Sequence, residues 1–285
     1  MYCQLISVLL NALSVLLAKL ALNQVSENAF LAIYALTFIS LALMYARVSE
    51  LAQYLCSRNG LASALFNSLG TWCFYKGLEK LTPGTHSFVA RSYIIFGTLI
   101  SVLWFREKLT TTKLFVLLAC ITGVVLSSLP AAAGSVTFEA VMLTLLSSLL
   151  FALNYAVLKK KPTDIHPCVP LGTNGFCLLI LLGCLSVSQK GWPFSEIAIH
   201  GIIYIVLSAA FIFYSMFAYI KSAGTIDFHV ATALRALSPV VVTLISLPFF
   251  GYSGSPIQMN GEVLIVVSIV AMGITQKMNT GRSVK

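Results

Sequence analysis

The fold of this chain is decided by long apolar runs such as Gly84-Thr-His-Ser-Phe-Val-Ala-Arg-Ser-Tyr-Ile-Ile-Phe-Gly-Thr-Leu-Ile-Ser-Val-Leu-Trp104. As a helix this run would be about 30 Å long, which is the thickness of the hydrocarbon core of a bilayer. Hydrophobic residues make up 58% of the chain and charged residues only 9%, whereas soluble domains carry roughly a quarter charged residues. We therefore predict an all-α membrane protein.

Similar apolar runs follow one another along the chain, separated by short polar or turn-rich segments. Ten transmembrane helices are predicted, near residues 3–22, 29–46, 60–78, 84–104, 113–129, 137–158, 166–188, 197–219, 226–250 and 260–276. No connector between them is long enough for a folded domain outside the membrane.

Basic residues are distributed unevenly between the two sides of the predicted membrane domain. Twelve of the 18 Lys and Arg residues follow even-numbered spans or lie in the C-terminal tail, whereas only four lie at the ends of odd-numbered spans. Cytoplasmic loops of membrane proteins are enriched in Lys and Arg. This distribution predicts a multi-pass protein of the inner (cytoplasmic) membrane with both termini in the cytoplasm.

The two halves of the chain resemble each other. A shift of 144 residues places Arg91 on Arg235, and a shift of 140 places Lys19 on Lys159. Each half has five predicted spans, an odd number, so the second half would enter the membrane in the opposite orientation. Inverted repeats around a site at the midplane are the architecture of many secondary transporters, which work by alternating access. The two predicted repeats are residues 1–130 and 137–278.

Three short motifs carry a resemblance to a known family. They are Trp104-Phe-Arg-Glu-Lys-Leu-Thr110 at the end of the fourth span, Gly123-Val-Val-Leu126 in the fifth and Leu237-Ser-Pro-Val-Val241 in the ninth. With these motifs the chain resembles the EamA-type transporters of the drug/metabolite transporter (DMT) superfamily over nearly its whole length. The resemblance implies ten spans in two inverted five-helix repeats.

Two arginines lie deep within predicted spans. Arg91 is about seven residues into the fourth span, about 10 Å from its end, and Arg235 is about nine residues into the ninth. None of the nine acidic residues falls near the centre of a span. The functional interpretation is that both arginines face a water-filled cavity and bind a carboxylate or phosphate of the substrate. The alternative is that each binds backbone carbonyls and only braces the fold.

Other polar residues accompany the two arginines at helical spacing. Ser87 lies four residues before Arg91, while Thr232 and Ser238 lie three residues before and after Arg235. Residues three or four apart share a helix face. All three are therefore candidates for the same substrate site.

Further candidates come from other spans. The family resemblance implies that Asn11, Ser14 and Asn154 line the cavity. Tyr75 and Tyr219, which the shift of 144 superimposes, are candidates to stack on a planar substrate or to form a gate. The alternatives are hydrogen bonds between helices for the small polar residues, and a place in the interfacial aromatic belt for the tyrosines.

Motifs of enzymes and of metal sites are absent from the sequence. It has no G-x-x-x-x-G-K-[ST] loop for a nucleotide and no H-E-x-x-H helix for zinc. The seven cysteines include no C-x-x-C pair. The net charge of +9 follows from basic loops rather than from a patch for nucleic acid. We expect no enzyme activity, no cofactor, no metal and no nucleic-acid partner.

Three functions fit these observations. The leading hypothesis is a secondary transporter or exchanger for a small metabolite with an anionic group, such as an amino-acid-like, nucleotide-like or organic acid. The second is a broad-range drug or amino-acid exporter with structural arginines. The third is a non-transporting membrane scaffold or subunit, against which the inverted repeat argues because a scaffold needs no access symmetry. The lipid bilayer is a partner in every case, and both a monomer and a dimer fit.

Overall fold

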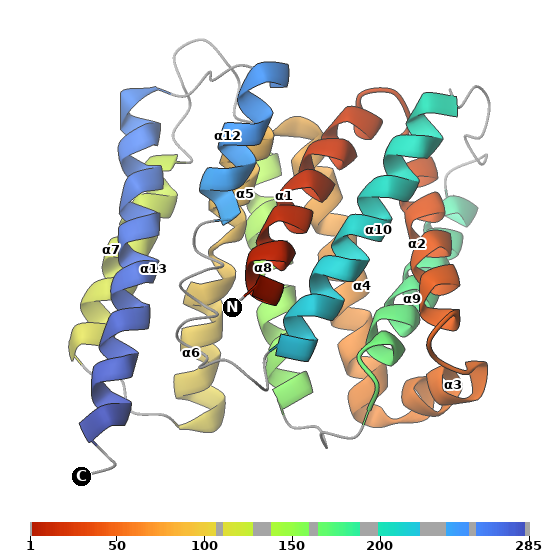
Figure 1. The fold of residues 1–285 in the computed structure, drawn as a ribbon, viewed down its shortest axis with the longest axis horizontal. Helices are drawn as coiled ribbons and strands as arrows, with labels where there is room; N and C mark the ends of the chain where they lie inside the picture. Colours follow the sequence, from red (N-terminus) through yellow and green to blue (C-terminus); the bar gives the residue numbers. More distant parts are fainter. Residues whose placement is uncertain are drawn as a thin grey trace.

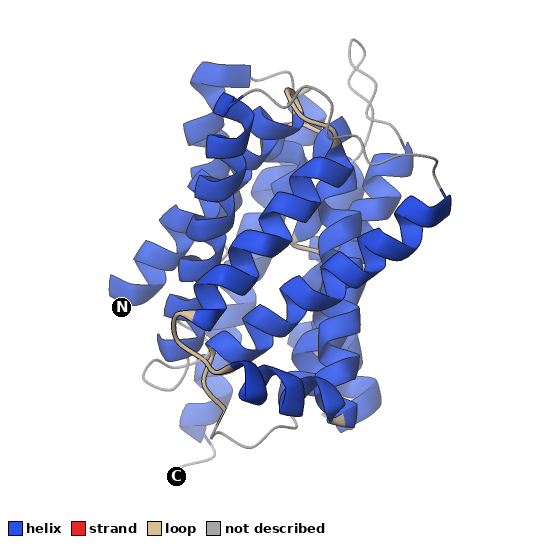
Figure 2. Ribbon diagram, turned by 90° about the vertical axis from the view of Figure 1, so that its right-hand side faces the viewer, coloured by secondary structure: helices blue, strands red, loops and turns tan. Residues whose placement is uncertain are grey.

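A computed structural model describes residues 2–106, 111–127, 138–159, 165–188, 199–222, 238–250 and 255–282, and all regular elements among them are α-helices (Figures 1 and 2). The helices of the first half are α1 (Tyr2–Leu22), α2 (Glu27–Leu43), α3 (Val48–Cys56), α4 (Arg58–Lys80), α5 (Pro83–Ala90), α6 (Tyr93–Phe105) and α7 (Thr111–Ser127). Those of the second half are α8 (Phe138–Lys159), α9 (Cys168–Ser188), α10 (Ile199–Ser222), α12 (Ser238–Phe250) and α13 (Pro256–Arg282).

The outside of this bundle is apolar. Leu103, Phe138 and Ile199 are 80%, 76% and 73% exposed, a distribution that suits contact with lipid tails rather than water. Among the described residues, five helical segments are long and apolar enough to cross a membrane, and the bent pair α2 and α3 is a sixth candidate. The prediction of an all-helical membrane protein is confirmed, and the number of ten spans stays a prediction.

The predicted second span, residues 29–46, differs from the structure at its end. Helix α2 stops at Leu43, and the segment predicted as a loop contains α3, which is turned by 114° from α2 (Figure 1). Leu51 and Tyr54 of α3 are buried, whereas Val48 is exposed. This short helix is therefore amphipathic, and it packs its apolar side against α4 and α9.

The predicted fourth span, residues 84–104, contains a turn in the structure. It consists of α5 and α6, which are separated by a turn at Arg91 and Ser92. The segment Pro83–Trp104 as a whole is long and apolar enough to cross a membrane, in agreement with the predicted span. A run of apolar residues indicates how far a segment extends in the membrane but not where a turn lies within it.

Helices of the first half pack mainly against helices of the second half. The closest pairs are α1 with α10, α4 with α8, α2 with α9, and α7 with α13, and Figure 1 shows each pair side by side. Hydrogen bonds join Ser7 to Ser215 and Ser14 to Ser208. Residue numbers rise along α1 as they fall along α10, so these two helices are antiparallel.

The main hydrophobic core lies among α1, α2, α4, α9 and α10. It contains Phe30 and Tyr34 of α2, Tyr75 of α4 and Phe213 of α10, all of them buried. The rings of Tyr34 and Tyr75 meet edge to face with their centroids 5.1 Å apart. This geometry is the favoured one for aromatic pairs.

Helices α7 and α13 approach each other closely at glycine. A Cβ atom added at Gly123 would lie 2.8 Å from the carbonyl oxygen of Gly261 and 3.0 Å from the backbone nitrogen of Ile265. Close approach of backbones at small residues is a main source of helix association in membranes. Only glycine fits at this position without displacing one of the two helices.

We therefore predict that Gly123→Ala destabilises the protein by about 1–3 kcal/mol, the usual cost of overpacking. The measurement is the apparent Tm of the detergent-purified protein, followed by size-exclusion chromatography after heating. Gly97→Ala is the matched control, because a Cβ atom at Gly97 meets nothing within 4 Å. Equal melting of the two variants would contradict the close contact between α7 and α13.

Candidate functional site

The start of α5, the first of the two helices in the predicted fourth span, is favoured by the local sequence. Thr82 precedes α5 as its N-cap and accepts a hydrogen bond from the backbone N–H of Thr85, and Pro83 occupies the first turn. Both residue types favour a helix start at this position.

Helix α5 ends in a tight turn. The backbone N–H groups of Arg91 and Ser92 donate to the carbonyls of Phe88 and Val89, three residues earlier, at 3.0 Å each. The hydroxyl of Ser92 donates to the Val89 carbonyl as well, at 2.6 Å. Serine hydroxyls compete in this way with helical backbone bonds. The regular pattern resumes when Phe96 donates to the Ser92 carbonyl, so Arg91 sits at a break between two helices.

Arg91 lies where the first half meets α8 of the second half. Its guanidinium carbon is 5.9 Å from the centre of the Tyr93 ring, and that ring is 6.2 Å from the ring of Tyr155 on α8. The hydroxyl of Ser148, also on α8, donates to the Ala90 carbonyl at 3.0 Å. Arg91 is half-buried. A cation beside an aromatic ring at this distance is weakly attracted to it.

A second contact between the halves joins Asn11 of α1 to Ser238, the first residue of α12. The Asn11 side-chain amide donates to the Ser238 hydroxyl at 2.9 Å. Ser238 is buried, and Asn11 is half-buried. The structure therefore brings together two predicted site residues from opposite halves of the sequence.

Ser14 and Tyr75 both lie within the packed interior. The Ser14 hydroxyl donates to the Ser208 carbonyl at 2.9 Å, and both Ser14 and Tyr75 are buried. The ring of Tyr75 is enclosed by other aromatic rings. Tyr75 therefore packs in the core in this state of the protein, and does not stand in a belt at the lipid interface.

Asn154 lies in the contact between α8 and α4. Its side-chain oxygen accepts from the Ser63 hydroxyl at 2.6 Å, and its amide donates to the side-chain oxygen of Asn67 at 3.1 Å. This bonding corresponds to the alternative weighed from the sequence, a hydrogen bond between helices.

The remaining predicted site residues are placed as follows. Ser87 is buried in α5, one turn before Arg91. Arg235 and Thr232 lie outside the described residues, and Tyr219 lies in α10 but its side chain is outside the described part. The predicted pairing of Arg91 with Arg235 is therefore untested.

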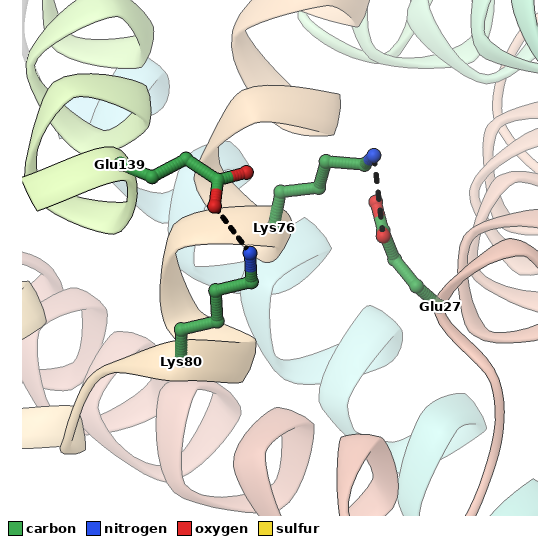
Figure 3. Close-up of polar contacts among 4 residues, drawn as sticks. All are labelled: Glu27, Lys76, Lys80 and Glu139. Carbon is green, nitrogen blue, oxygen red and sulfur yellow. Dashed lines mark hydrogen bonds and ion pairs between the residues drawn. The ribbon is translucent and has the colours of Figure 1, made fainter. Parts of the chain in front are cut away.

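Charged residues gather at one end of α4 (Figure 3). Lys76 lies 3.8 Å from the Glu27 carboxylate of α2, and Lys80 donates to Glu139 of α8 at 2.6 Å. The hydrogen bond to Glu139 raises the pKa of Lys80, which lies beyond the predicted span. The exposed pair of Lys80 and Glu139 contributes little to stability. Lys19 of α1 donates to the carbonyls that end α4, including that of Leu78 at 2.9 Å.

Sequence reasoning missed two features of the described residues. Ser7 and Ser215 form a buried pair beside that of Ser14 and Ser208, and the seven-residue spacing on each helix was a signal that could have found them. Glu262 of α13 is buried, although the sequence places it near a span end. Within the described part of the chain, no group of three or more His, Cys, Asp or Glu residues could hold a metal ion.

Comparison with known proteins gives the family. A model of the EamA-like transporter family matches residues 1–129 and 138–274. No curated protein matches the sequence. One solved crystal structure of a protein is similar in fold, with a TM-score of 0.63. Its sequence is 14% identical to this chain, and the match covers 97% of both chains.

The family match extends over nearly the whole chain and confirms the resemblance carried by the three sequence motifs. Members of this family are secondary transporters of small molecules and not enzymes. The chain therefore belongs to the EamA-like transporter family, and it is a multi-pass membrane transporter.

Proposed function

We propose that this chain moves a small metabolite with an anionic group across the inner membrane by alternating access. In this proposal ten transmembrane helices form two inverted five-helix repeats, residues 1–130 and 137–278, with both termini in the cytoplasm. The substrate is an amino-acid-like, nucleotide-like or organic acid, bound between the repeats.

The observation that carries the proposal is the position of Arg91 at the break between α5 and α6. Broken helices in transporters leave helix termini free to face a substrate near the midplane. The N-terminus of α6 carries a partial positive charge, and the guanidinium of Arg91 adds a full one. A planar guanidinium binds carboxylate or phosphate through two parallel hydrogen bonds. An anionic group on the substrate suits this combination best.

The pattern of helix contacts supports the inverted arrangement. Residue shifts near 140 place α1 on α8 and α4 on α10, so the contact between α1 and α10 is the counterpart of that between α8 and α4. The contact of α12 with α1 corresponds in the same way to that of α6 with α8. A two-fold relation between the halves accounts for both correspondences.

The proposed site has an inner and a supporting layer. Arg91 and Asn11, which are half-buried, would meet the substrate together with Ser238, to which Asn11 is hydrogen-bonded. Buried Ser14, Ser87, Asn154 and Tyr75 would hold these helices in position. Arg235 and Tyr219, the counterparts of Arg91 and Tyr75, belong to the proposal on the sequence alone, as does Thr232.

The role of the charge on Arg91 can be tested by substitution. In proteoliposomes, Arg91→Gln should raise the KM for an anionic solute about 10- to 100-fold, the loss expected for a charge-assisted hydrogen bond of about 1.5–3 kcal/mol. Arg91→Lys should raise the KM by a smaller factor, because lysine keeps the positive charge but cannot form the two parallel hydrogen bonds of a guanidinium. The measurement is uptake of a radiolabelled panel of carboxylates, phosphates and neutral analogues.

Arg58→Gln is the matched control, since it removes the same charge from the exposed start of α4. If Arg91→Gln and Arg58→Gln both transport anions like the parent protein, Arg91 braces the fold and the substrate class is wrong. Movement of only neutral or cationic solutes would favour the broad-range exporter.

The predicted orientation can be tested by cysteine labelling. Cys56 is exposed in α3, and exposed Lys80 stands at the opposite end of α4. In variants with a single cysteine, a membrane-impermeant maleimide should label Cys56 only in inside-out vesicles and Lys80→Cys only in right-side-out vesicles. The reverse pattern would place both termini outside, and labelling of both cysteines in the same vesicles would exclude an α4 that crosses the membrane.

A further inference from the structure

Helix α3 lies across one end of the bundle. It is turned by 114° from α2, which runs along the bundle beside α9 (Figure 1). A helix at such an angle to a helix that crosses the membrane lies closer to the membrane plane than to the membrane normal. The nine residues of α3 extend over about 14 Å, whereas the hydrocarbon core is about 30 Å thick.

Contacts with the bundle fix the orientation of α3. Leu51 and Tyr54 are buried, and a Cβ atom added at Gly172 of α9 would lie 2.8 Å from Cδ2 of Leu51. Beyond the end of α3, the Ser57 hydroxyl donates to the Tyr54 carbonyl at 2.7 Å and accepts a bond from the backbone N–H of Gly60 at 3.0 Å. The helix therefore presents a constant set of residues outward.

The outward side of α3 is divided into an apolar strip and a polar strip. Val48 and Ala52, which are four residues apart and share one face, are exposed and form the apolar strip. Ser49, Glu50 and Gln53 are exposed as well, and at 100° per residue they occupy the rest of the outward side. Three sectors thus follow one another around the helix: buried, exposed apolar and exposed polar. A helix at the edge of the hydrocarbon core has three matching surroundings, namely protein, lipid and water.

The apolar strip continues the lipid-facing side of α2. Leu36 and Leu43 of α2 are seven residues apart, so they share a face, and they are 54% and 39% exposed. Met44, directly after α2, is 70% exposed, and Val48 is 63% exposed. Exposed apolar side chains therefore extend from α2 around the bend to α3, and the lipid tails that cover α2 also cover the strip.

Residues typical of the headgroup region of a membrane lie beside this strip. Tyr45, which is exposed, lies in the bend, and its hydroxyl oxygen is 3.4 Å from that of Tyr214 on α10. Arg47, also exposed, directly precedes α3. Tyrosine is enriched where a membrane meets water, and the long arginine side chain extends its charge to that level. The bend between α2 and α3 therefore lies at the level of the lipid headgroups.

We propose that α3 is an interfacial helix embedded in one leaflet, with acyl chains against Val48 and Ala52 and lipid phosphates beside Arg47. Its partner is the phospholipid of the leaflet at that end of α2, which the distribution of basic residues predicts to be the cytoplasmic one. Amphipathic helices bind in this way with their apolar side about 5–10 Å into the boundary of headgroups and acyl chains. The inference assumes neither an anionic substrate nor alternating access.

Spin labels test the two strips separately and need no substrate. Each label is attached to a single cysteine in the full chain with its native cysteines replaced, in liposomes. Collision rates are measured with oxygen, which concentrates in lipid, and with a water-soluble nickel chelate. Val48→Cys and Ala52→Cys should collide severalfold more with oxygen than with the chelate, as Leu36→Cys on α2 should. Glu50→Cys and Gln53→Cys are the matched controls on the same helix, and they should show the reverse ratio.

Two outcomes would overturn the proposal. Chelate access at Val48→Cys equal to that at Gln53→Cys would place all of α3 in water. Protection of Val48→Cys from both reagents would show that protein, such as a second copy of the chain, covers the strip. Ala52→Cys decides if Val48→Cys does not fold. None of these results depends on which solute is transported, so the proposed substrate stands or falls separately.

Discussion

Packing between the two halves of the chain is the interaction on which the rest of this structure depends. Lipid tails are as apolar as leucine, so helices in a membrane associate through close packing and hydrogen bonds rather than through the hydrophobic effect. Here both occur where α1 meets α10, through two pairs of serines that bond to each other's backbones. The register set by Ser14 places Asn11, about one turn earlier on α1, within reach of Ser238 on α12.

The two counterpart contacts share a geometry but not a chemistry. Between α1 and α10 the polar groups face backbone, whereas between α4 and α8 they face other side chains. The bond from Ser63 to Asn154 is buried, as are the four serines between α1 and α10.

The charged side chains of α4 and its neighbours lie where water can reach at least one member of each ion pair. The ion pairs of α4 lie at its end, where water is available, and Lys19 completes the hydrogen bonding of the last turn of α4. None of the nine acidic residues lies near the centre of a predicted span. Half-buried Glu27 and buried Glu262 are spatial facts that spacing along the chain does not reveal. What distinguishes Arg91 is its place at a helix break beside α8.

Composition and the length of the apolar runs by themselves determined that this protein is helical and lies in a membrane. Runs of about 20 apolar residues with so few charged residues cannot cover a surface that faces water. Short motifs determined its family. Only the structure showed that α5 ends at Ala90, because the turn at Arg91 and Ser92 leaves the hydropathy of the run unchanged. The structure also showed that Asn11 contacts Ser238 and that Ser7 contacts Ser215. Residues more than 200 positions apart become neighbours only through the register in which two helices pack, and the sequence does not reveal that register.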